Sequence, residues 1–269
     1  MKKMILLLSL GIFFLAFKPL EKHLAIESLA IRTFVPSPES PFKVGEKLSY
    51  QLRYGWIEAG KAELEIQSTN QAFEGSPILH MVGTGYSEGT FDWFYKVRDR
   101  YETYVDVAAH RPHKFIRKIH EGGFHMEREL IFDQKEKLVR TDKKGEMKIP
   151  SDVQDMLSSF YYLRTLDMEN ASIGDVYVVN AFLDYELFPF KVKYLGTETV
   201  KVKKGKFLCY KFVPVVQKGR IFKDEEDLVV WVSKDKNKIP ILAKADVLVG
   251  SIKMEIDTYE GLIGPISKI

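Results

Sequence analysis

Cysteine is almost absent from this chain, since its 269 residues include only Cys209. One cysteine excludes an internal disulfide, so the fold must be held by its hydrophobic core. Cys209 stands between Leu208 and Tyr210 in a strand-like run, where a small buried hydrophobe is a better interpretation than a nucleophile. Its position deep in the chain also argues against a lipid anchor attached through it.

An excess of charge of one sign is also missing. The formal net charge is +3, and lysine and arginine alternate with aspartate and glutamate along most of the sequence. Nucleic-acid binding needs a basic stripe or patch, so this pattern predicts no nucleic-acid partner. Solvated strand faces account for most of these charges.

The common enzyme and cofactor motifs are not found. The sequence has no G-x-S-x-G, no P-loop, no G-x-G-x-x-G after a strand and no H-E-x-x-H. His110 and His113 are separated by Pro112, which breaks a helix, and a glycine pair separates His120 from His125. We therefore predict no metal, no cofactor and no catalytic residue.

Long hydrophobic runs are limited to the N-terminus, where Lys2 and Lys3 precede the apolar residues 4–17. This pattern is typical of a secretory signal peptide over residues 1–17 and predicts export to the periplasm or cell envelope. An uncleaved membrane anchor is the alternative, because Leu15-Ala16-Phe17 is a poor cleavage site. Residues 18–41, with three prolines near their end, are interpreted as a linker.

From residue 42 the chain has the period-two alternation of β-strands, with turn residues every 8 to 12 positions. About a dozen strands are expected against one good helix. We predict a mainly β protein, with one large curved antiparallel sheet, half-barrel or barrel-like, wrapped around one amphipathic helix at 151–167. The whole of 42–260 is expected to form one domain, followed by a tail at 261–269, because no linker flanks the helix.

The expected helix is organised around an apolar face. Ser151 is the predicted N-cap, with Gln154 completing a capping box. Residues at helical spacing then share one side, and they are Val153, Met156, Leu157, Phe160, Tyr161 and Arg164.

Charged residues fall on strand faces that are otherwise apolar. The odd positions of 91–107, interpreted as one long strand that bends or carries a bulge, place Asp99 inward. Arg117 and Arg128 lie on the apolar faces of the next two strands. A lone buried carboxylate is costly, so Asp99 is expected to pair with Arg117, Arg128 or Arg164. The cluster either binds an anionic or amphiphilic ligand or is a structural ion pair, and a bulge would instead turn Asp99 outward.

The aromatic run from Phe91 to Tyr95 is expected either to line an apolar ligand cavity or a carbohydrate-stacking surface, or to form ordinary core. The predicted ligand-binding residues are therefore Asp99, Arg117, Arg128, Arg164, Trp93 and Phe160.

The order and spacing of five segments resemble an exported bacterial family, domain of unknown function 3108 (DUF3108). The segments are RYGWIEAGKAELEI (53–66), DWFYKVRDRYETYVD (92–106), SDVQDMLSSFYYLRTLD (151–167), KYLGTETVKVKKGKFLCYKFVP (193–214) and VVWVSKDKNKIPI (229–241). The resemblance covers about residues 42–260 and implies an envelope protein with a β-rich fold. The family is more distantly similar in shape to the periplasmic lipoprotein carriers, whose curved sheet holds helices on its concave side.

Three functions remain open at this point. The favoured one is non-catalytic binding of a lipid or other hydrophobic or anionic ligand between sheet and helix. A structural or assembly partner of another envelope protein, with a filled core, is the alternative. An enzyme acting on an envelope polysaccharide would need two carboxylates facing one groove, and only Asp99 is predicted to face inward.

Overall fold

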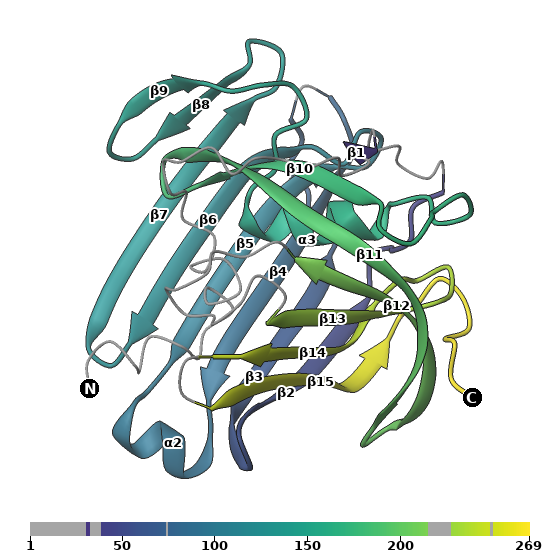
Figure 1. Ribbon diagram of the computed structural model, residues 1–269. Coiled ribbons are helices and arrows are strands. Elements are labelled where there is room, and N and C mark those ends of the chain that lie inside the picture. Colours follow the sequence, from purple (N-terminus) through teal and green to yellow (C-terminus); the bar gives the residue numbers. More distant parts are fainter. Residues whose placement is uncertain (1–30, 33–38, 74, 215–226, 248–249) are drawn as a thin grey trace.

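A computed structural model describes residues 31–32, 39–73, 75–214, 227–247 and 250–269 (Figure 1). The predicted signal peptide at 1–17 and most of the predicted linker lie outside the described residues. Fifteen strands form one sheet. Their bounds are β1 Ile31–Arg32, β2 Lys47–Tyr54, β3 Ile57–Gln67, β4 Ile78–Ser87, β5 Arg98–Asp106, β6 Pro112–Glu121, β7 Phe124–Asp133, β8 Leu138–Thr141, β9 Gly145–Lys148, β10 Val176–Leu183, β11 Glu186–Val202, β12 Gly205–Pro214, β13 Leu228–Ser233, β14 Pro240–Asp246 and β15 Ser251–Glu260.

The strand order is β1-β10-β11-β12-β13-β14-β15-β2-β3-β4-β5-β6-β7-β8-β9. Every neighbouring pair is antiparallel except β1 and β10. Successive strands pair as hairpins within each half of the chain, and the pairing of β15 with β2 joins the two halves into one sheet. The sheet begins at β1 and ends at β9, so it is curved but not closed. This confirms the predicted half-barrel-like fold.

The helix α3 (Met156–Arg164) lies inside the curve, in contact with β4 and β5 on one side and β10 on the other (Figure 1). Its helical part is shorter than the predicted 151–167. Asp155, rather than Ser151, is the N-cap, and its side chain accepts hydrogen bonds from the backbone N–H groups of Leu157 and Ser158. The Ser158 hydroxyl accepts from the Asp155 N–H, which completes the capping box.

The segment before α3 is extended because it pairs with the sheet. Gln154 N–H donates to Asn180 O at 2.8 Å and Gln154 O accepts from Phe182 N–H at 2.7 Å. These bonds attach the chain to β10, so the predicted capping box of Ser151 and Gln154 is wrong. A helix cannot begin at Ser151 while Gln154 acts as a strand residue.

The long strand predicted at 91–107 is also wrong in its first part. Residues Gly89–Phe94 form a short helix, α2, and β5 begins only at Arg98. Gly89 has φ of +57°, which turns the chain out of β4, and Asp92 then holds the side chains of Ser87 and Arg98 at 2.5 and 2.7 Å. The predicted alternation of buried odd-numbered residues therefore holds only from Val97 onward.

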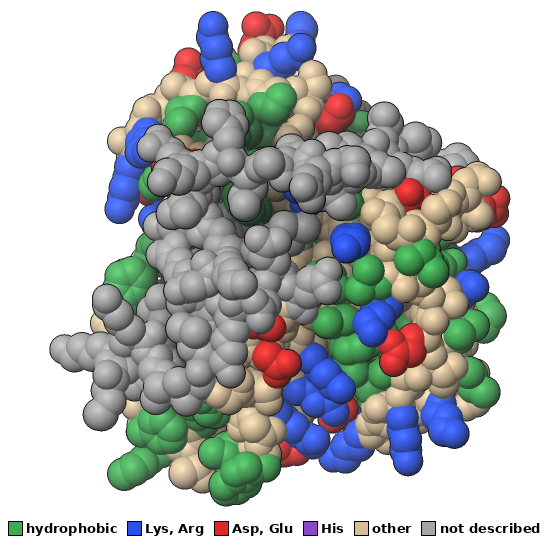
Figure 2. All heavy atoms as spheres, viewed as in Figure 1, with side chains coloured by type: hydrophobic (Ala, Val, Ile, Leu, Met, Phe, Trp, Pro, Cys, Tyr) green, Lys and Arg blue, Asp and Glu red, His purple; other side chains and the backbone are tan. Residues whose placement is uncertain are grey.

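Two clusters of buried side chains make up the core. The larger surrounds α3 and draws on strands from both halves of the sheet, and it includes Tyr50, Tyr101 and Tyr161. Cys209 belongs to it and is fully buried, as predicted for a small hydrophobe. The smaller cluster lies beneath β10–β13 and contains Phe190 and Phe212. Space-filling atoms in Figure 2 show hydrophobic side chains gathered over β12–β14, with lysine and arginine side chains among them.

Candidate functional site

The predicted polar cluster of Asp99, Arg117, Arg128 and Arg164 does not form as one unit. The three arginines are inside the fold, as the strand and helix faces predicted, but they pair with acids from distant parts of the chain. Asp99 instead lies beside the carboxyl group of Glu121. The cluster is therefore divided among three places around α3.

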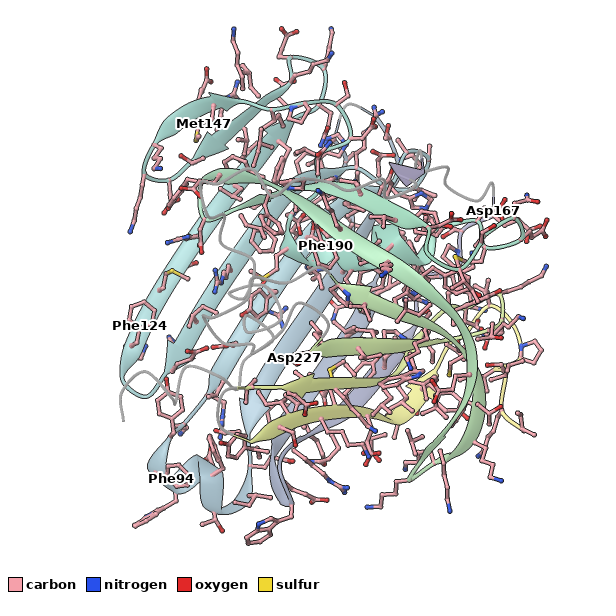
Figure 3. The ribbon with its side chains drawn as sticks, in the orientation of Figure 1. Phe94, Phe124, Met147, Asp167, Phe190 and Asp227 are labelled. Carbon is pink, nitrogen blue, oxygen red and sulfur yellow. The ribbon has the colours of Figure 1, made fainter. Side chains whose placement is uncertain are left out.

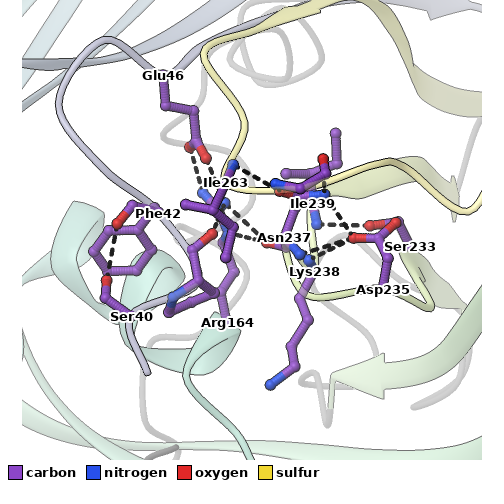
Figure 4. Close-up of polar contacts among 12 residues, drawn as sticks. Ser40, Phe42, Glu46, Arg164, Ser233, Asp235, Asn237, Lys238, Ile239 and Ile263 are labelled. Atoms are coloured by element: carbon purple, nitrogen blue, oxygen red, sulfur yellow. Dashed lines mark hydrogen bonds and ion pairs between the residues drawn. The ribbon is translucent and has the colours of Figure 1, made fainter. Parts of the chain in front are cut away.

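Arg164, at the end of α3, binds Glu46 in a buried two-pronged ion pair (Figure 4). Its Nη1 and Nη2 donate to the two Glu46 carboxylate oxygens at 2.6 and 2.7 Å, and Nη2 also donates to Asn237 O at 2.9 Å. The rings of Phe42 and Tyr161 lie 5.2 and 5.3 Å from the guanidinium. Protein groups already satisfy this cation, which fits the structural interpretation of Arg164 better than ligand binding.

Arg117 and Arg128 stand opposite each other on β6 and β7, and both approach Asp184 at the tip of the β10–β11 hairpin. Arg117 Nη1 donates to Asp184 Oδ1 at 3.4 Å, and Arg128 Nη1 donates to the same oxygen. Asp184 and Tyr185 form the two-residue turn with φ of +46° and +69°. Tyr185 lies under Arg128, with its ring centre 4.7 Å from the guanidinium carbon.

These arginines line a small cavity of about 300 Å³, counting its open part. The wall is otherwise mostly apolar, from the facing strands, the hairpin and the first turn of α3: Phe115, Leu130, Met156, Phe182, Leu183 and Tyr185. The Nε–H groups of Arg117 and Arg128 are both buried, and neither has an acceptor. The structure thus brings together two of the predicted site residues, with donors to spare.

Asp99, on β5, is buried as predicted, but its side-chain partner is Glu121 of β6. Asp99 Oδ1 accepts from the backbone N–H of His120 at 3.1 Å. Burial, and then the neighbouring Glu121 carboxyl, raise the pKa of Asp99 to about 8, while Arg117 acts in the opposite direction through space. The expected ion pair of Asp99 with an arginine is therefore wrong, because a second carboxyl group stands beside Asp99 instead.

A larger apolar pocket lies at the other end of α3, between that helix and β11–β14. It encloses about 710 Å³, including the space open to solvent. Its walls are formed by Phe160, Leu163, Arg164, Leu166, Met168, Phe190, Val192, Tyr210, Phe212, Pro214, Val230, Val232, Lys238 and Pro240. Of the predicted site residues, Phe160 lies in this pocket, and Arg164 lines its wall while its guanidinium binds Glu46.

Most of the pocket wall was missed by the sequence reasoning. The signal that could have found it is the alternation of Phe190, Val192 and Tyr194 with Lys191 and Lys193 along β11, which marks an apolar face directed to the interior. Lys238, with φ of +46°, is the pocket's other cation, and its Nζ donates to Leu166 O. Burial lowers the pKa of Lys238 from its ordinary value.

Trp93 lies far from both cavities in the fold. It belongs to α2 and is 88% exposed, and Figure 3 shows its neighbour Phe94 at the α2 end of the sheet, away from Phe190 on β11. Four exposed aromatic side chains lie on three turns at this same end of the strands. They are Trp56 after β2, Trp93 and Phe94 between β4 and β5, and Phe124 after β6.

The single cysteine of the chain is buried and poorly suited to nucleophilic attack. Burial raises the pKa of the Cys209 thiol to about 12, so it is a poor nucleophile. Among the described residues, no group of three histidine, cysteine, aspartate or glutamate side chains is placed to hold a metal ion. In the same part of the chain, no helix combines the length and the apolar character needed to cross a bilayer.

Comparison with solved structures finds a protein with a similar overall fold. The chain is similar to a β-barrel-like protein of domain of unknown function DUF1849 from Brucella abortus, with a TM-score of 0.54 and 12% identity over 81% of this chain and 98% of that one. It also matches the hypothetical protein CT021 from Chlamydia trachomatis, with a TM-score of 0.38 and 9% identity over 84% of this chain and 92% of that one. None of the curated proteins searched matches the chain. The profile of the family described as protein of unknown function (DUF3108) matches residues 49–257, so the chain belongs to that family.

Proposed function

We propose that this is an exported cell-envelope protein that binds a lipid or another long-chain hydrophobic molecule, without catalysis, in the apolar pocket beside α3. The observation that carries the proposal is the pocket itself, whose walls are almost wholly aliphatic and aromatic. The charged N-terminal residues followed by the apolar run at 4–17 support export.

A long acyl chain suits this pocket for energetic reasons. Each buried methylene contributes about 0.8 kcal/mol, so ten of them supply about 8 kcal/mol before the cost of ordering the chain. Phe190 and Phe212 belong to the smaller core cluster and form part of the wall, so the pocket is continuous with a packed layer. A preformed apolar wall of this kind needs little rearrangement on binding.

The test is native mass spectrometry of the mature protein purified from its own envelope fraction, followed by organic extraction. We expect a bound hydrophobic molecule of defined mass. In Val232→Trp the indole fills the pocket, and the bound mass should be lost. Thr199→Trp is the matched control, because Thr199 is also a β-branched strand residue but is exposed and does not line the pocket. A bare polypeptide mass in the unmutated protein, or equal occupancy in both variants, would contradict the proposal.

Binding to another envelope protein is a second candidate, favoured by the exposed aromatic turns. Trp93 and Trp56 are 88% and 89% exposed at one end of the sheet, and aromatic side chains are enriched in protein interfaces. A photo-crosslinking residue at position 93 should capture one defined partner in cells. The same probe at Ile173, which is apolar and 74% exposed but lies between α3 and β10, should not. Equal labelling at both positions would argue against a specific interface.

A further inference from the structure

We propose that the cavity between Arg117 and Arg128 is a binding site for an anionic group, a carboxylate or a phosphate, separate from the apolar pocket. The site lies between β6, β7 and the tip of the β10–β11 hairpin, near the first turn of α3. The apolar pocket lies at the last turn of the same helix.

The charges of the cavity are unbalanced. Arg117 and Arg128 occupy directly opposed positions on neighbouring strands, where like charges are unfavourable. The one carboxylate that lines the cavity is Asp184, and both arginines use the same oxygen of it. Two guanidinium charges thus face a single acid in a partly apolar enclosure, and a second anion would neutralise the excess.

The unused donors point to the same ligand class. The Arg117 side chain is only 9% exposed, yet its Nε–H has no acceptor, and the buried Nε–H of Arg128 also has none. A buried donor without an acceptor is costly, and native proteins rarely leave one so. Planar guanidinium groups bind carboxylate and phosphate oxygens with two parallel hydrogen bonds, so these residues suit an oxyanion.

The rest of the wall is mostly apolar, which suits an oxyanion attached to an apolar group. Phe115, Leu130 and Met156 surround the arginines, and the Tyr185 ring covers Arg128. Lys144 adds a third cation 5.4 Å from that ring, while Asp142 accepts a hydrogen bond from the Tyr185 hydroxyl. The shared chemistry is an oxyanion, which either belongs to a lipid headgroup or fatty acid or is a free ion.

The experiment follows the Nε–H groups directly. Protein labelled with ¹⁵N-arginine is titrated with sodium phosphate at constant ionic strength, and the Nε–Hε resonances are recorded by NMR. The signals of Arg117 and Arg128 should shift in a saturable manner. Arg140 is the internal control, because it is 58% exposed and already paired with Glu146, and its signal should not follow the same curve. Shifts of Arg117 and Arg128 no larger than that of Arg140 would overturn the proposal.

Two variants separate binding from a purely structural role. Arg128→Met should weaken phosphate binding by roughly ten- to a hundred-fold, as expected for loss of charge-assisted hydrogen bonds. Asp184→Asn removes the internal competitor and should tighten phosphate binding, although it loosens the hairpin. A structural ion pair predicts no such gain. Unchanged phosphate affinity in both variants would overturn the proposal, whether or not their stability changes.

A second titration identifies the source of the anion. Dodecyl phosphate, used below its micelle concentration, carries the same headgroup on a chain. Tighter binding of dodecyl phosphate at the same arginine signals would assign the site to a lipid headgroup, and equal binding would assign it to a free ion. Inorganic phosphate has no chain, so its result does not depend on the apolar pocket, and the two proposals can fail separately.

Discussion

Replacing Glu46 with glutamine is expected to lower the free energy of unfolding by about 3–5 kcal/mol. The Glu46 and Arg164 side chains are 1% and 3% exposed, so glutamine would leave a cation inside the protein without its counterion. A charge buried in this way keeps its desolvation cost and loses the attraction that offset it. The two residues are far apart in sequence, so the unfolded chain gains nothing from the pair.

The magnitude follows from the contacts of the guanidinium. The change removes two charge-assisted hydrogen bonds, at 2.6 and 2.7 Å, and each is worth about 1.5–3 kcal/mol. The glutamine carbonyl can keep one of them in neutral form. Asn237 O and the rings of Phe42 and Tyr161 still hold the cation. We therefore expect a loss near the lower end, about 3 kcal/mol.

Urea unfolding of matched variants is the assay. Glu146→Gln is the control, because Glu146 pairs with Arg140 at 2.8 Å but both side chains are more than half exposed. Its cost should stay below about 1 kcal/mol. The double variant of Glu46→Gln with Arg164→Met should cost less than the sum of its single changes by about 1–3 kcal/mol. Equal losses for Glu46→Gln and Glu146→Gln, or strict additivity, would refute the reasoning.

Three further changes test other parts of the fold. Asp155→Ala removes the N-cap of α3 and should cost about 2 kcal/mol in urea unfolding, at the upper end of measured caps because the site is buried. Gly60→Ala should also destabilise the protein, because the new Cβ would lie 2.2 Å from Tyr86 O, and thermal unfolding would show a lower midpoint. The pKa of Asp99 is about 8 in the folded state, against 3.8 in the unfolded chain, so the folded protein holds the extra proton between these two values. The free energy of unfolding should therefore fall as the pH rises from 3.8 to 8, by up to about 1.4 kcal/mol per pH unit. Stability should be measured between pH 6.5 and 8, because burial lowers the pKa of His110 from 6.5 and its titration at lower pH has the opposite effect on stability. Asp99→Asn should flatten the dependence of stability on pH in this range. An unchanged slope would contradict the assignment.

Local sequence patterns were sufficient for the strands and for the direction of the buried charges. Strict alternation placed Arg117 and Arg128 inward, and helical spacing did the same for Arg164. The two-residue period of a strand and the 3.6-residue period of a helix are properties of one segment, so the buried face can be predicted without knowing which element packs against it. The same reasoning failed at 91–96, where the turn at Gly89 and the hydrogen bonds of Asp92 replace a strand by α2.

The partners of the buried charges could not be predicted in the same way. Glu46 reaches Arg164 across 118 positions, and Asp184 reaches Arg128 across 56, because the two halves of the chain fold over each other. Asp99 was expected to attract an arginine, but its neighbour on β6 is Glu121. The contacts of Asp184 depend on how the β10–β11 hairpin crosses the sheet, and the pair of Glu46 with Arg164 depends on where α3 lies. No single segment records either arrangement.

The position of α3 explains why one sheet contains two cavities of opposite character. Burial of apolar surface is non-directional, so packing alone would allow the β10–β11 hairpin to slide over the helix. The contacts of Asp184 with β6 and β7 fix the hairpin tip, and the pair of Arg164 with Glu46 fixes the other end of the helix. With the hairpin tip and the end of α3 both held, the helix stays apart from β12–β14, and the apolar pocket lies between them beside Phe160. The polar contacts thus set the spacing of the elements that surround the apolar pocket.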